Sequence, residues 1–237
     1  TFVKEFIYNI LQTTDDSIGL VSLEESTSET VRGFISMDLN KRVGLPGVDT
    51  TVEEEKAAFD RVLGTGRVQL LDHAGSIQDD SLVDKLEFLA LSGCKYIVLD
   101  HITVAVSESI NGNVNAAIDA LMSALLKIVK RHDVHITVIS HLRKVGGGSQ
   151  SFEAGAAIQM DDLKGSGSLK QISAQVISLS RDLTAENALE RNTVRVHVLK
   201  DRFSGATGPA GSYIYNEETG RLEEAMAPEL NDFKQEF

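Results

Sequence analysis

The stretch Tyr96-Ile97-Val98-Leu99-Asp100 (YIVLD) is an apolar run that ends in an acidic residue. Apolar runs of this length, without polar alternation, are typical of strands that are buried on both faces of a parallel sheet. In open α/β sheets, ligands bind beyond the carboxyl ends of the strands. An Asp at that point can hold Mg²⁺ through water, which is the Walker B role in nucleoside triphosphatases. A strand-end Asp that caps the next turn explains the pattern equally well, because the pattern is common.

Similar short runs alternate with longer stretches of helical periodicity along the chain. We expect strands at Ile18–Leu23, Arg67–Leu71, Tyr96–Asp100, Val134–Ser140, Gln175–Ser180, Thr193–Lys200 and Ser212–Tyr215. We expect helices at Phe2–Gln12, Ser28–Asn40, Val52–Leu63, Asp79–Leu91 and Val114–Arg131. Strands that alternate with helices indicate βαβ units. The sequence therefore predicts an α/β fold, with a mostly parallel twisted sheet flanked by helices and antiparallel strands near the C-terminus.

Length and composition fit a globular protein. The chain has 237 residues, of which 42% are hydrophobic, enough for one large domain or two small ones. Cys94 is the single cysteine, so an internal disulfide is excluded. No apolar run approaches the roughly 18 residues of a membrane-spanning helix. No signal-peptide pattern is visible at the N-terminus, and we expect a cytoplasmic protein.

Further polar residues follow the expected strands. Glu24 and Glu25 come after Ile18–Leu23, and His141 follows the apolar strand before it. Two acids on neighbouring strand tips suit a metal ligand and a water-activating base. The alternative is that the glutamates favour the start of the next helix through its dipole. His73 and His101 also follow strands, but no His/Cys spacing in the chain resembles a zinc site.

Two basic or glycine-rich segments lie in the last third of the chain. Lys200 and Arg202 are two residues apart, so both side chains can face one anion, and Arg suits the completion of a neighbour's active site. The alternative is an exposed hairpin with solvated charges. The segment Lys164–Ser168 (KGSGS) allows close backbone approach to a phosphate, but it is weak support. It is not a P-loop, and G-x-x-x-x-G-K-[ST] occurs nowhere in the chain.

Six segments in order resemble one family. LEES, YIVLDHITVAVS, ISHL, DLKGSGSLKQ, LKDRFSGATG and YNEETG resemble the helicase half of podophage primase–helicases. The mitochondrial Twinkle helicase and the DnaB family are more distant relatives. The resemblance extends from Thr1 to about Leu222. It implies a RecA-like motor core that assembles into a ring, usually a hexamer, with nucleotide between subunits and single-stranded DNA in the channel.

The resemblance also implies residue roles. Glu24 matches the glutamate that activates water, Asp100 matches the acid near Mg²⁺, and His141 matches the residue that couples the γ-phosphate to the DNA loop. Arg202 matches the arginine finger and Lys200 its companion. Arg181 and Tyr215 match positions that line the nucleotide base or ribose. The expected DNA-facing residues are Arg143, Lys144 and Lys164 as phosphate contacts, Gly165 and Gly167 in the adjoining turn, and Gln171 in the same network.

The resemblance further implies Mg²⁺ and ATP or dTTP as cofactors of the parent protein. In this family, Thr1-Phe2-Val3 comes immediately after the P-loop, so we expect an N-terminally truncated motor core over residues 1–222. We expect residues 223–237 to form an acidic flexible tail. Without the P-loop, the fragment is expected to be inactive by itself. The expected partners are single-stranded DNA, neighbouring subunits and replisome proteins, without a membrane, in a bacterial or phage-infected cell.

The charge distribution and two alternatives bear on this interpretation. The net charge of −12 argues against a protein that is basic all over. Residues 140–202 nevertheless contain nine basic and seven acidic residues, which permits a narrow DNA-contacting surface. One alternative is a RecA-like recombinase or another RecA-type ATPase. The other is a non-enzymatic DNA-binding or ring-interaction fragment that lacks a P-loop.

Overall fold

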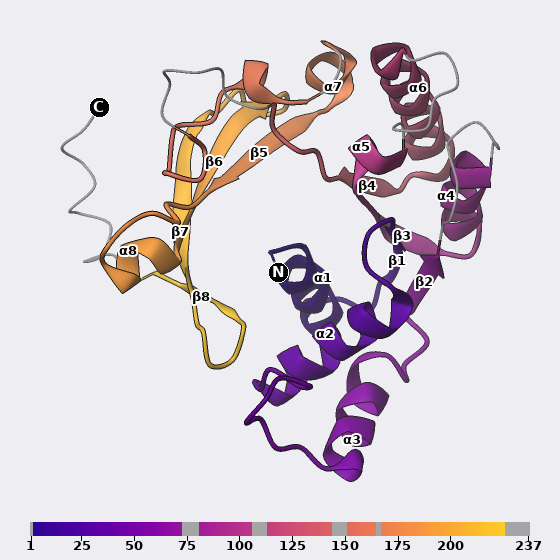
Figure 1. Ribbon diagram of the computed structural model, residues 1–237. Helices are drawn as coiled ribbons and strands as arrows, with labels where there is room; N and C mark the ends of the chain where they lie inside the picture. Colours follow the sequence, from indigo (N-terminus) through magenta and orange to yellow (C-terminus); the bar gives the residue numbers. More distant parts are fainter. Residues whose placement is uncertain (1, 73–80, 106–112, 144–150, 165–166, 226–237) are drawn as a thin grey trace. The chain divides into compact units, whose positions relative to one another are not determined.

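The computed structural model describes residues 2–72, 81–105, 113–143, 151–164 and 167–225 (Figure 1). These residues divide into two compact units. The parallel-sheet unit contains residues 2–142 and 163–172, and the antiparallel-sheet unit contains residues 143–162 and 173–225. Each unit is described by itself below. The single core expected over residues 1–222 therefore stays a prediction.

Four parallel strands form the centre of the first unit, in the order β2-β1-β3-β4. They are β1 (Ser17–Ser22), β2 (Val68–Asp72), β3 (Cys94–Asp100) and β4 (His135–Val138). All four lie within or close to the stretches expected from the sequence. Ser22 is in register with both Asp72 and Asp100, so the carboxyl ends of these three strands lie at one edge of the sheet.

Helices cover both faces of this sheet (Figure 1). They are α1 (Phe2–Thr13), α2 (Thr27–Leu39), α3 (Val52–Val62), α4 (Ser81–Leu91), α5 (Ile102–Ala105), α6 (Val114–His132) and α7 (Gly167–Ile172). Ile97 and Leu99 pack with residues of α4 and α6, whereas Val98 packs with residues of α1 and α2 on the other face. Successive residues of a strand point to opposite faces, so a strand covered on both sides is apolar throughout.

Local features fix where these elements begin and how closely they pack. Ser26 caps α2, its side chain accepting from the backbone N–H of Glu29 while the Glu29 carboxylate accepts from the Ser26 N–H. A Cβ atom at Gly19 of β1 would lie 2.7 Å from Cδ1 of Leu89. Glycine at this position therefore permits the close approach of α4 to the sheet.

The second unit is an antiparallel sheet in the order β5-β6-β7-β8, which confirms the predicted change to antiparallel strands. Its strands are β5 (Gln175–Ser180), β6 (Thr193–Asp201), β7 (Gly208–Tyr215) and β8 (Leu222–Glu224). A 3₁₀ turn at Met160–Asp162 precedes the sheet, and the short helix α8 (Ala188–Asn192) lies between β5 and β6.

Strand β8 corrects the expected start of the tail. Glu223 and Glu224 belong to this strand and pair with Ile214 and Tyr213 of β7. Their side chains are exposed, so the charges remain solvated while the backbone completes the sheet. The prediction that the tail starts at Glu223 was therefore wrong for these two residues, and residues 226–237 lie outside the described part of the chain.

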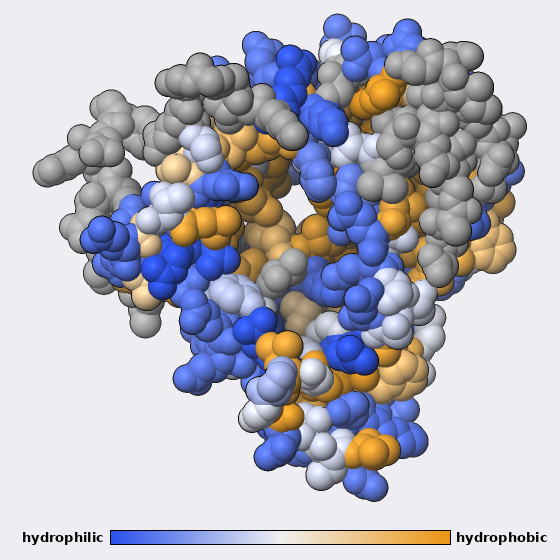
Figure 2. Space-filling view, in the orientation of Figure 1, coloured by the Kyte–Doolittle hydropathy of each residue, from blue (hydrophilic) through white to orange (hydrophobic). Residues whose placement is uncertain are grey.

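Surface composition adds one observation about the described residues. Hydrophilic and hydrophobic residues are interspersed over the visible face (Figure 2). No helix in the described ranges is both long and apolar enough to cross a membrane.

Candidate functional site

The carboxyl edge of the parallel sheet brings together side chains from three strand ends. Strands β1, β3 and β4 are neighbours, and each leads directly into a polar residue expected to be functional: Glu24, Asp100 and His141. The backbone N–H of Leu23 donates a 2.7 Å hydrogen bond to the carbonyl of Asp100, which holds the segment before Glu24 beside the end of β3. The expectation that these strand tips meet is confirmed.

His101 lies at the centre of this group. Its side chain is 3% exposed, and its Nε2 atom lies 2.9 Å from Oε1 of Glu24. Its Nδ1 atom lies 2.6 Å from the hydroxyl of Thr103. Its ring stacks against the ring of His141, with centroids 3.8 Å apart and planes inclined by 37°. His101 therefore contacts both the proposed water-activating residue and the proposed phosphate sensor.

The sequence interpretation missed His101 as a site residue. It noted that His101 follows a strand, but it compared the histidines only with the linear spacing of zinc motifs. Ligands that come from separate strands of a parallel sheet have no fixed spacing in sequence. The available signal was position, because His101 follows Asp100 directly at the carboxyl end of β3.

Asp100 is partly buried at the same edge. Burial raises the pKa of its carboxyl, and the nearby charge of His101 opposes this shift. The neighbouring carboxylates of Glu25 and Glu24 raise the pKa further. Negative charge is thus concentrated and partly desolvated here, which is the environment that a bound cation relieves. The peptide bond between Asp100 and His101 is cis.

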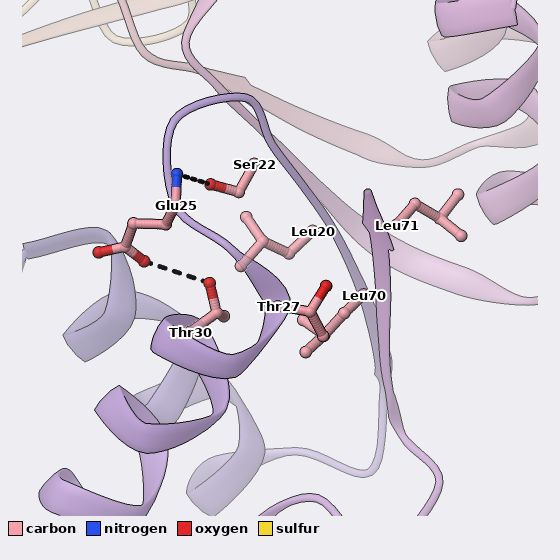
Figure 3. A pocket seen from close by; sticks show the side chains of 7 residues that line it. All are labelled: Leu20, Ser22, Glu25, Thr27, Thr30, Leu70 and Leu71. Atoms are coloured by element: carbon pink, nitrogen blue, oxygen red, sulfur yellow. Dashed lines mark hydrogen bonds between the residues drawn. The ribbon is translucent and has the colours of Figure 1, made fainter. Parts of the chain in front are cut away.

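Glu25 has different partners from Glu24. Its carboxylate forms a 2.8 Å ion pair with Lys4 of α1 and accepts a 3.2 Å hydrogen bond from the hydroxyl of Thr30 in α2. Its backbone N–H donates to the hydroxyl of Ser22 (Figure 3). Glu25 therefore anchors the turn between β1 and α2, where a small pocket opens. The pocket is lined by Leu20, Ser22, Glu25, Thr27, Thr30, Leu70 and Leu71.

Lys200 and Arg202 lie in the antiparallel-sheet unit, at the end of β6. Burial lowers the pKa of Lys200, and the positive charge of Arg202 lowers it further, so the two cations lie close together. The backbone N–H of Arg202 donates to Ala174, and its guanidinium reaches the carbonyl of Ser173 at 3.4 Å. Asp201 accepts from the N–H of Phe203, forming the turn that carries exposed Arg202.

Arg181 and Tyr215 are neighbours in the same unit. The guanidinium carbon of Arg181 lies 5.3 Å from the centre of the Tyr215 ring, within the range of a cation–π contact. Arg181 also donates to the carbonyl of Arg191 and to the side chain of Asn192. These contacts orient Arg181 within its own unit, and a role in binding the base or ribose stays a prediction.

The expected DNA-facing residues are described in part. Lys164 is exposed, and its backbone N–H donates a 2.9 Å hydrogen bond to the carbonyl of His141. Gly167 begins α7, and Gln171 is an exposed residue of that helix. Arg143 is exposed, and its backbone N–H donates to the carbonyl of Asp162. Lys144 and Gly165 lie outside the described residues.

Comparison with known proteins identifies relatives for nearly the whole chain. The chain is 36% identical over 233 residues to a DNA helicase/primase of Enterobacteria phage T3, a match that covers 94% of this chain. The chain spans about 40% of the length of that relative. No family model matches it.

Two solved structures show the same fold. One is a helicase ATPase domain that superposes with a TM-score of 0.76 at 19% identity, covering 95% of this chain and 80% of the other. A DnaB-like replicative helicase, solved in a study of its interactions with primase, superposes with a TM-score of 0.77 at 20% identity. That match covers 95% of this chain and 54% of the other. The expectation of a RecA-like core is confirmed.

Proposed function

We propose that this chain, a homologue of a phage DNA helicase/primase with the RecA-like fold of DnaB-like helicase ATPase domains, is the motor domain of a replicative DNA helicase. It couples hydrolysis of ATP or dTTP to movement along single-stranded DNA and to unwinding of the duplex. The observation that carries the proposal is the convergence of Glu24, Asp100 and His141 at the carboxyl edge of the parallel sheet in a chain with this relative.

Asp100 suits a magnesium ion. Mg²⁺ prefers oxygen ligands and keeps several of its waters, so a single carboxylate at a strand end is sufficient. The raised pKa of Asp100 supports this assignment, because a nearby cation would offset the burial and the repulsion from Glu24 and Glu25. When bound, the ion neutralises charge on the phosphates of the nucleotide.

Glu24 and His141 have distinct proposed roles at the same edge. The carboxylate of Glu24 is 57% exposed, so it can reach a water molecule and accept its proton, while the contact with His101 fixes one oxygen. His141 is exposed and contacts His101 through its ring. The backbone bond from Lys164 to the His141 carbonyl links it to the segment expected to face DNA. Movement of His141 on γ-phosphate binding would therefore shift that segment.

Arg202 completes the proposed site from a neighbouring subunit of a ring. It is exposed on a turn held by Asp201, with Lys200 nearby. An arginine finger that stabilises charge in the transition state accelerates hydrolysis by about 10³–10⁵-fold. Single-stranded DNA would be held mainly through its backbone, so its binding would weaken steeply with salt. Replisome proteins are the further expected partners.

The test uses the protein extended N-terminally through the P-loop that we expect to precede Thr1. Hydrolysis of ATP or dTTP that is stimulated by single-stranded DNA, together with unwinding of a forked duplex, would support the proposal. Strand exchange without unwinding would favour a recombinase. Binding of DNA without hydrolysis would favour a non-enzymatic protein.

A further inference from the structure

We propose that Glu24, His101 and His141 form a binding site for a transition-metal dication of the zinc class, separate in chemistry from the magnesium assigned to Asp100. Each residue offers one ligand atom, and these atoms all lie within 4.8 Å of one another. Ligands of a tetrahedral zinc ion are bound at about 2.0–2.2 Å, which places them about 3.3 Å from one another. Glu24 and His101 are already 2.9 Å apart, so side-chain rotation at exposed His141 would complete the set.

Thr103 supports His101 in the way that metal ligands are usually supported. A histidine that binds a metal almost always uses its other ring nitrogen in a hydrogen bond, which fixes its tautomer and orientation. Here Nδ1 of His101 lies 2.6 Å from the Thr103 hydroxyl, and both side chains are buried. When Nδ1–H donates to Thr103, the Nε2 lone pair is directed toward the Glu24 carboxylate, where the ion would sit.

The ligand types determine which metal fits. Two imidazoles and one carboxylate favour Zn²⁺, Co²⁺ or Ni²⁺, whereas Mg²⁺ prefers sites built from oxygen. Three protein ligands also leave a position for water. The site should therefore bind zinc in the presence of a large excess of magnesium.

Occupancy would have a consequence that rests on the proposed function. The ion would take the carboxylate of Glu24 and the ring of His141 together, so neither could act on water or on the γ-phosphate. Zinc would then inhibit hydrolysis while the nucleotide stays bound. The binding of the ion is independent of that function and is tested without it.

The experiment is a titration of the folded protein with Zn²⁺ against a chromophoric chelator, in excess Mg²⁺. We expect one zinc per chain, with affinity at least about tenfold weaker in His101→Gln and in His141→Gln. Thr103→Val should weaken binding by about 10–100-fold, as the loss of a supporting partner does. The matched control is His132→Gln, because His132 also lies 2.8 Å from a glutamate, Glu87. This control should leave zinc affinity unchanged.

Absence of a stoichiometric site would overturn the proposal, and so would unchanged affinity in His101→Gln or an equal loss in His132→Gln. Circular dichroism checks that each variant is folded. If the His101 variant is not folded, the wild-type protein loaded with Co²⁺ decides. An intense four- or five-coordinate visible spectrum supports the site, and the weak spectrum of octahedral cobalt contradicts it. Because none of these measurements uses hydrolysis, failure of the motor proposal would leave this result intact.

Discussion

Glu24 and Glu25 are adjacent in sequence but have different surroundings. Glu24 contacts His101, which is stacked on His141, whereas Glu25 is paired with Lys4. A carboxylate that acts on water must be free to approach it, and an ion pair that anchors a turn serves stability. The structure therefore separates two candidates for the water-activating residue that the sequence alone leaves side by side.

The first prediction follows from this difference. In the protein that carries the P-loop, Glu24→Gln should slow hydrolysis by about 10²–10⁴-fold, the usual contribution of a positioned base, and should leave nucleotide binding largely intact. Glu25→Gln is the matched control and should change turnover little. Steady-state hydrolysis and equilibrium nucleotide binding measure the two effects. Normal turnover in Glu24→Gln, with loss in Glu25→Gln, would move the base to Glu25.

A second prediction concerns Arg202. Arg202→Ala should abolish DNA-stimulated hydrolysis, a loss of about 10³–10⁵-fold, because a finger acts on the transition state of a neighbour's nucleotide. Nucleotide binding should change little. Arg131→Ala provides a control, since Arg131 is also exposed but pairs with Glu87 on a helix. Loss of nucleotide binding equal to the loss of turnover would contradict the finger role.

His101 shows why part of the site is not readable from sequence. Glu24, Asp100 and His141 could be placed at strand ends, because apolar runs before them mark buried strands. The bond between Glu24 and His101 joins residues 77 positions apart, and it depends on β1 and β3 being neighbours. Strand order is a property of the folded sheet, so a residue that acts through such a contact carries no local pattern.

At the scale of elements, the long strands and helices were predictable and the short ones were not. The strand β3 is covered on both faces, and α6 has a sustained apolar stripe, so each is marked by its own pattern. Helices α7 and α8 have six and five residues, too few for a recognisable period. Strand β8 is charged and depends on pairing with β7.

The cap of α3 gives a third prediction. The side chain of Thr51 accepts from the N–H of Glu54, and the Glu54 carboxylate accepts from the N–H of Thr51. Thr51→Ala should lower the free energy of unfolding by about 0.5–2 kcal/mol, while Thr51→Ser should retain most of the stability. Urea unfolding measures both variants. Equal stability of the alanine variant and the wild type would show that the cap contributes nothing.

A fourth prediction concerns the contact between α4 and α6. Glu87 of α4 accepts hydrogen bonds from His132 and Arg131 of α6, and these bonds lower the pKa of its carboxyl below the ordinary 4.5. The stabilisation is therefore present above pH 4.5 and is lost as the pH falls through the lowered pKa of the folded state.

Thermal unfolding of the wild type and Glu87→Gln across this pH range measures the effect. The wild type should be the more stable protein at about pH 7, and the difference should shrink on acidification below about 4.5. Glu53→Gln on α3 serves as a control for the loss of one surface charge. A difference that grows as the pH falls would contradict the assignment.

At the scale of the whole molecule, the overall acidity conceals an uneven distribution. The net charge is −12, yet residues 140–202 hold more basic than acidic residues. That segment includes Arg143, Lys164, Lys200 and Arg202, all of which are expected to meet DNA or phosphate. Acidic residues elsewhere favour solubility, and a locally basic surface is sufficient to hold the DNA backbone.

The central claim is that this chain is a helicase motor whose strand-end residues hydrolyse nucleotide. The most direct test is unwinding of a forked DNA duplex by the P-loop-containing protein, with Glu24→Gln measured in parallel. The account predicts unwinding that requires ATP or dTTP in the wild type, and retained nucleotide binding without unwinding in the variant. Unwinding of equal rate in Glu24→Gln, or hydrolysis by the wild type without any unwinding, would contradict it.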